Sequence, residues 1–191
     1  MKYLFLFILL YLSPLHKVTA SSVDSLLVQN YKKGDETVSR IIDSNNIKDS
    51  LTNKSFCSLL FENLWTITIQ TDNSFVLYYG YRIGDNEMTR KEISSDNKIL
   101  LRLFSFEQDK IEHPVYKREN YYTPMYWYFV LLDSLHNKKF EWNAYSKSND
   151  KYADECFDVL MDYFVFIMNL TIEDKLDRDL SRISEDVLTD H

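Results

Sequence analysis

The chain has 191 residues and a formal net charge of −7, from 22 basic and 29 acidic side chains. An acidic protein repels phosphate backbones and anionic membranes, so this balance argues against a nucleic-acid-binding protein. Only three glycines and three prolines occur, which argues against glycine-rich phosphate loops and long flexible linkers.

The first twenty residues have the pattern of a secretory signal peptide. Lys2 provides the positive start, residues 3–12 form an apolar core, and small residues precede a cut after Ala20. The apolar run is shorter than the roughly 20 residues that span a bilayer. We expect a secreted or periplasmic protein without a membrane span, with residues 21–191 as a single domain. Losing Lys2 and Lys17 and no acid would change the charge from −7 to −9. An uncleaved anchor is the alternative.

The two cysteines, Cys57 and Cys156, both lie in the expected mature chain. An even number of cysteines in an oxidising compartment predicts one disulfide, which would close a loop of about 100 residues. Two buried free thiols are the alternative. Asn53-Lys54-Ser55 and Asn169-Leu170-Thr171 are glycosylation sequons, used only if the source is a eukaryote.

Two helices are predicted after the signal peptide. The first covers 21–31 and ends at Lys32-Lys33-Gly34, and the second covers 35–51. Residues 55–63 fit a helical turn and an alternating strand equally well.

The clearest local signal is a β-hairpin. Residues 64–71 and 74–82 are rich in β-forming side chains, and Asp72-Asn73 between them suits a two-residue turn. This turn pairs Ile69 with Val76, Ile67 with Tyr78 and Trp65 with Gly80, and it places these apolar side chains on one face. The opposite face is also fairly apolar, so it is either covered or a binding surface.

Weaker signals follow the hairpin. Residues 87–93 alternate as an edge strand does, and 98–106 read as a fourth strand, with a helix as the alternative. Thr123 and Pro124 mark the start of a helix reaching about His136. Residues 138–146 suit a short strand.

The C-terminal part predicts two helices. Residues 151–170 form a core helix that packs on the sheet, and a last helix begins at Thr171. The core helix has an apolar face of Ala153, Cys156, Phe157, Leu160, Phe164 and Ile167. The last helix has a narrow apolar seam of Ile172, Leu176, Leu180, Ile183 and Val187, which either docks on its own domain or receives a partner helix. The expected class is α+β, an antiparallel meander of about four strands with flanking helices, the C-terminal ones covering the sheet.

Two surfaces are candidates for binding. Asp154, Asp158 and Asp162 recur once per turn on the core helix, and Tyr121 and Tyr122 precede an aromatic segment. The acidic stripe lacks the loop that usually supplies the about six to eight oxygens of a Ca²⁺ site, so we interpret it as a solvated face. The tyrosines are the members of their segment most expected to be exposed.

Signals for catalysis are weak. The histidines of the expected mature chain, His113, His136 and His191, fall in no zinc-protease or nucleophile motif. Four glutamates are candidates for a hydrolytic pair, without a way to rank them: Glu62, Glu107, Glu112 and Glu141. We predict no cofactor and no metal.

The leading hypothesis is a non-catalytic protein-binding module with a basic protein partner, such as an inhibitor or a toxin-neutralising protein. The alternatives are a small hydrolase that uses loop carboxylates and a carrier of apolar ligands.

Overall fold

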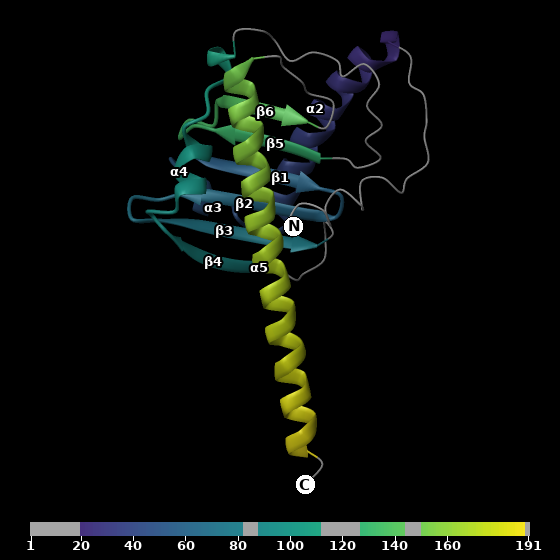
Figure 1. Ribbon diagram of the computed structural model, residues 1–191, viewed down its shortest axis with the longest axis vertical. Helices are drawn as coiled ribbons and strands as arrows, with labels where there is room; N and C mark the ends of the chain where they lie inside the picture. Colours follow the sequence, from purple (N-terminus) through teal and green to yellow (C-terminus); the bar gives the residue numbers. More distant parts are fainter. Residues whose placement is uncertain (1–19, 82–87, 112–126, 144–149, 190–191) are drawn as a thin grey trace.

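A computed structural model describes residues 20–81, 88–111, 127–143 and 150–189, with side chains described from Tyr31 to Asp177 outside the gaps. It is an α+β fold, a six-stranded antiparallel sheet with helices on both faces (Figure 1). The predicted class is confirmed, with six strands in place of about four.

The strands lie in the order β4-β3-β2-β1-β5-β6, and every neighbouring pair is antiparallel. Their bounds are β1 Phe56–Phe61, β2 Leu64–Gln70, β3 Ser74–Tyr81, β4 Met88–Ser94, β5 Trp127–Leu132 and β6 Lys138–Asn143. The helices are α2 Ala20–Ser44, α3 Lys48–Leu51, α4 Lys98–Phe104 and α5 Lys151–Thr189, with a 3₁₀ turn at Gln108–Lys110.

The predicted hairpin is confirmed in its register. Ile69 pairs with Val76, Ile67 with Tyr78, and Trp65 with Gly80, as the two-residue turn at Asp72-Asn73 requires. The backbone N–H of Thr71 donates to the Ser74 carbonyl and closes the turn. Local turn chemistry was sufficient here because turn length sets which residues face each other.

Two predicted elements have the wrong type. The predicted helix ending near His136 is a strand over Trp127–Leu132, whereas its start at 123–126 lies outside the described residues. This strand is buried on both faces, so its apolar residues run continuously and do not alternate. The predicted fourth strand is helix α4, where the Asn97 side chain accepts a hydrogen bond from the Leu100 N–H at 3.0 Å and caps the first turn.

Successive side chains along each strand point to opposite faces of the sheet, where they form two separate apolar layers. The layer under α4 and α5 contains Leu59, Leu77 and Phe129, and the layer on the opposite face, with α2 and α3, contains Ile67 and Tyr128. Figure 1 shows α5 crossing the front of the sheet, with α2 behind it. Both faces are therefore covered, which answers the question left open by the hairpin.

Helix α2 continues through Gly34, where the sequence predicted a break. Gly34 is buried against the ring of Tyr128, and a Cβ at this position would lie only 2.4 Å from the Tyr128 Cδ1 atom. The Tyr128 hydroxyl also donates to the Asp35 carboxylate at 2.6 Å. Gly34 thus allows the close approach of α2 to β5.

The two predicted C-terminal helices are one continuous helix of 39 residues. The Thr171 hydroxyl donates back to the Met168 carbonyl at 2.9 Å, so it bonds within the helix and does not cap a new one. No glycine or proline interrupts residues 151–189. Within the described part of the chain, none of the helices is long and apolar enough to cross a membrane.

Candidate functional site

One side of α5 holds the helix to the sheet. Ala153, Cys156, Leu160, Tyr163 and Ile167 recur every three or four residues, and all are buried. Of the six residues predicted to face inward, five are buried. Phe157 is the exception: it is 38 % exposed, and its ring lies 6.4 Å from that of Trp127. The sheet-facing side of α5 is therefore structural.

The centre of this contact is a buried polar group. The Tyr163 hydroxyl lies 2.7 Å from the Thr68 Oγ1 atom and 3.1 Å from the Thr66 Oγ1 atom, both on β2. All three side chains are buried, and Cys57 lies beside them. Burial is the main cause that raises the pKa of Cys57 to about 12 and raises that of Tyr163 well above its usual value. A thiol that stays protonated is a poor nucleophile, so this cluster fits a structural role.

The predicted disulfide is wrong: Cys57 and Cys156 are both free and buried. Cys57 contacts Tyr163, and Cys156 precedes Tyr163 by seven residues, about 10 Å along the helix axis. Bonded cysteines have Cβ atoms about 3.8 Å apart. The register of α5 on the sheet therefore keeps the two thiols from bonding.

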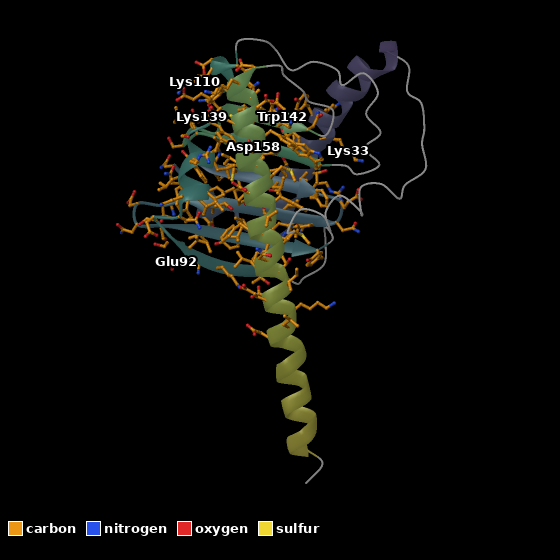
Figure 2. The ribbon with its side chains drawn as sticks, viewed as in Figure 1. Lys33, Glu92, Lys110, Lys139, Trp142 and Asp158 are labelled. Atoms are coloured by element: carbon orange, nitrogen blue, oxygen red, sulfur yellow. The ribbon has the colours of Figure 1, made fainter. Side chains whose placement is uncertain are left out.

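The opposite side of α5 carries the acidic stripe. Asp154, Asp158 and Asp162 are exposed, and Figure 2 shows Asp158 on the part of the helix that crosses the sheet. With 100° per residue, these three point away from the buried side. No lysine or arginine occurs between Lys151 and Lys175. The predicted solvated face is confirmed as exposed, and its charged residues are all acidic.

Apolar side chains run beside this stripe. Ile172 and Leu176 are 53 % and 56 % exposed, and Met161, Val165 and Met168 are half-buried. These residues and the acidic ones share one side of the helix, which we call the outer face of α5. Its members are Asp154, Phe157, Asp158, Met161, Asp162, Val165, Met168, Asn169, Ile172 and Leu176.

The outer face continues past the sheet because the helix is longer than the sheet is wide. Six strands about 4.8 Å apart span about 24 Å, whereas 39 helical residues span about 58 Å. Lys91 on the edge strand β4 forms an ion pair with Asp174. Beyond that point α5 leaves the sheet (Figure 1). Leu176 thus lies past the edge strand, and Ile172 lies near that edge with its side chain 53 % exposed.

The other predicted site residues do not join this face, with the exception of Asn169. Asn169 is exposed on α5, and Asn53 is exposed in the loop before β1. Tyr121 and Tyr122 lie outside the described residues, as do Glu112, His113 and His191. His136 lies in the β5–β6 turn, where its Nε2 atom is 3.1 Å from the Leu51 carbonyl oxygen.

Two of the candidate carboxylates, Glu107 and Glu141, form ion pairs with nearby lysines. Glu107 pairs with Lys110 at 2.7 Å, which lowers the pKa of this glutamate. Glu141 pairs with Lys138 at 2.7 Å, and Lys138 also contacts Asp35. Glu62 is exposed in the β1–β2 turn. In the part of the chain with described side chains, no three histidine, cysteine or acidic residues gather as metal ligands.

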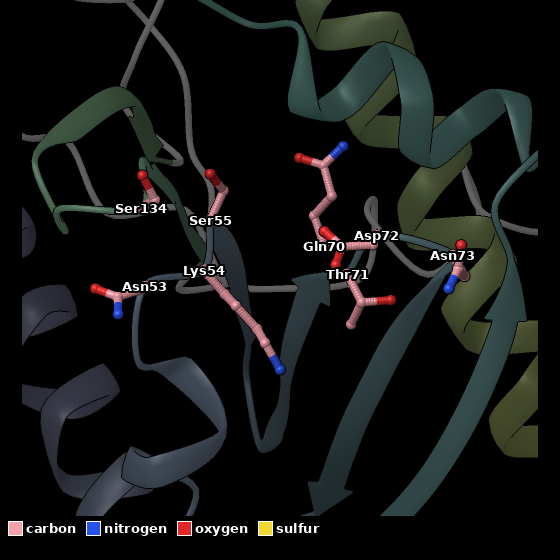
Figure 3. A pocket seen from close by; sticks show the side chains of 8 residues that line it. All are labelled: Asn53, Lys54, Ser55, Gln70, Thr71, Asp72, Asn73 and Ser134. Carbon is pink, nitrogen blue, oxygen red and sulfur yellow. The ribbon is translucent and has the colours of Figure 1, made fainter.

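An open pocket of about 480 Å³ lies at one end of the sheet, between the start of β1 and the β2–β3 turn (Figure 3). Its lining is polar: Asn53, Lys54, Ser55, Gln70, Thr71, Asp72, Asn73 and Ser134. Such a surface can form hydrogen bonds with a polar group. It lacks the aromatic and aliphatic walls that a carrier of apolar ligands needs.

Tyr163 and Gly34 were not singled out as functional or structural contacts from the sequence. Tyr163 occurs at the correct helical spacing after Cys156 and Leu160, a signal that was present but masked by the apolar run around it. Gly34 reads as a helix end from the sequence, because its contact with Tyr128 comes from a distant part of the chain and leaves no local signal.

Comparison with known protein families, with curated proteins and with solved structures finds no match for this chain.

Proposed function

We propose that this chain is a non-catalytic protein-binding module of the extracytoplasmic space, and that it binds its partner through the outer face of α5. The observation that carries the proposal is the exposure of Ile172 and Leu176 on a helix that extends past the sheet. Single exposed apolar residues are common on protein surfaces. Here they continue a stripe that begins at Phe157 and follows the helical period.

The energetics favour a partner at this face. Fully burying a leucine or isoleucine side chain contributes about 1.5–3 kcal/mol. Because Ile172 and Leu176 are about half exposed, burial by a partner would contribute roughly half of that for each residue. A helix that leaves its domain also loses the packing that normally stabilises helices in water. A partner would supply apolar burial and hold the projecting segment in place.

The proposed compartment rests on the N-terminal pattern. Residues 1–20 read as a cleaved signal peptide, and the expected mature protein is strongly acidic. The first residue found by N-terminal sequencing of the protein from its native host should be Ser21. Detection of Met1 in the native protein would contradict signal cleavage.

Site-specific photo-crosslinking tests the binding surface. A photoreactive phenylalanine analogue replaces Leu176 in one variant and Leu135 in the control. Leu135 is 79 % exposed in the β5–β6 turn, so exposure alone would favour the control. In the native compartment, the Leu176 variant should give a discrete crosslinked species with another protein, and the Leu135 variant should not. Equal crosslinking at both positions, or none at Leu176, would refute the proposed surface.

A further inference from the structure

We infer that the partner docks as a basic amphipathic helix lying along the outer face of α5. This inference rests on the proposed function and specifies the chemistry of the partner. Three observations carry it: the single sign of charge on this part of α5, the spacing of its apolar residues, and the length of the apolar stripe.

The charge of this part of α5 selects a basic partner. Between Lys151 and Lys175 the helix has six acidic residues and no basic one; the acids are Asp154, Glu155, Asp158, Asp162, Glu173 and Asp174. Asp174 is paired with Lys91, and Glu155 lies 3.7 Å from Lys151. No ion pair to Asp154, Asp158 or Asp162 occurs among the described side chains, so lysine or arginine residues of a partner can reach them.

The spacing of the apolar residues selects a helical partner. Phe157, Met161, Val165, Met168, Ile172 and Leu176 follow one another in steps of four, four, three, four and four. Two helices pack by placing such ridges into each other's grooves, whereas a strand has a period of two. From Phe157 to Leu176 the stripe is about 28 Å long, which matches about five turns of a partner helix. Met161 and Met168 are half-buried against the core under α5, and the parts of these flexible side chains that remain exposed adapt to varied partners.

The same charges disfavour the other occupants. A second copy of this chain would place its own acidic stripe against this one, at a cost in repulsion. An anionic membrane would be repelled for the same reason. A basic helix is the occupant whose charge and apolar spacing both complement the outer face.

The test uses a synthetic 22-residue peptide with leucine at helical spacing and lysine elsewhere, labelled with a fluorophore. Binding to the mature chain is followed by fluorescence anisotropy at low salt. One control peptide has glutamate in place of lysine, and a second has the same composition rearranged so that leucine and lysine alternate. We expect the lysine helix to bind at least tenfold more tightly than either control.

Two matched protein variants locate the binding. D154N/D158N/D162N removes three charges from the outer face, and E36Q/D43N/D49N removes three exposed charges from α2 and α3 on the other side of the sheet. The first should weaken peptide binding about tenfold, and the second less than twofold. Equal weakening by the two variants would mean non-specific attraction to net charge and would overturn the inference.

A variant with two apolar residues replaced distinguishes docking on the apolar stripe from attraction by charge alone. I172Q/L176Q should weaken peptide binding about tenfold, whereas L101Q on α4, at a residue 47 % exposed, should have no effect. Sedimentation equilibrium of the free chain detects the alternative occupant, because a dimer abolished by I172Q/L176Q would identify a second copy in place of a basic helix. If Leu176 crosslinks to a protein but the lysine peptide does not bind, the inference fails while the proposed function stands.

Discussion

Replacing Gly34 with alanine tests how α2 is attached to the sheet. In an exposed helix interior this change stabilises a protein by about 1 kcal/mol, because alanine is the better helix former. Here the new Cβ would lie 2.4 Å, 2.5 Å and 2.7 Å from three ring atoms of Tyr128, where ordinary contacts are 3.4–4 Å. Tyr128 lies on β5, between β1 and β6; its ring is fully buried, and its hydroxyl is bonded to Asp35. It has little room to retreat.

The expected sign of the change follows from comparing the two effects. Overpacking of a filled site costs about 1–3 kcal/mol, and an overlap of roughly 1 Å against a buried ring belongs at the upper end of that range. After subtraction of the gain in helix propensity, Gly34→Ala should lower the free energy of unfolding by about 2 kcal/mol.

Urea unfolding of the mature chain, followed by far-UV circular dichroism, measures this difference. Ser39→Ala, at an exposed position of the same helix, serves as the control for propensity and should change stability by less than about 0.5 kcal/mol. A double-mutant cycle with Tyr128→Leu should show that the two changes are coupled by about 1 kcal/mol, because the smaller side chain makes room for the Cβ. A Gly34→Ala protein as stable as the wild type would refute the reasoning.

Three further outcomes follow from the α5 contact. Tyr163→Phe removes hydrogen bonds to Thr66 and Thr68 and should cost about 1–2 kcal/mol in the same urea assay; no loss would show that the hydroxyl is dispensable. Because both thiols are free and buried, a maleimide should add nothing to the native chain and two labels to the denatured chain; denatured protein that takes up label only after reduction would reveal a disulfide. Cys57 keeps its proton in the folded state to about pH 12 but loses it near pH 9 once unfolded, so its contribution to stability is complete below pH 9 and falls as the pH rises from there. Between pH 8 and pH 10 this thiol should account for about 1 kcal/mol of lost stability, and Cys57→Ala should show a correspondingly smaller decrease than the wild type.

Local sequence patterns correctly predicted the elements that are determined by interactions between residues close together in the chain. The β2–β3 register followed from a two-residue turn between β-rich runs, and the core helix followed from apolar residues at helical spacing. The sheet-facing residues of that helix were mostly identified for the same reason. These features depend on residues within one or two turns of each other, so the sequence contains the relevant evidence.

The type of β5 and α4 could not be settled in this way. Trp127–Leu132 is apolar without a period because the strand lies in the sheet between β1 and β6 with both faces covered. Residues 98–104 carry apolar side chains that suit a strand or a helix, and the choice is made by packing against α5. Similarly, Lys32-Lys33-Gly34 has the composition of a helix end, although the glycine is required by the ring of Tyr128.

The sequence by itself determined the α+β class, the hairpin and the two stripes on the C-terminal helix, because each follows from the periodicity of neighbouring residues. Only the tertiary structure decided that Cys57 and Cys156 stay apart, and that Ile172 and Leu176 are exposed. Both outcomes depend on where α5 lies on the sheet and where the sheet ends. Strand number and order set that width, and they arise from pairings between residues far apart in the chain.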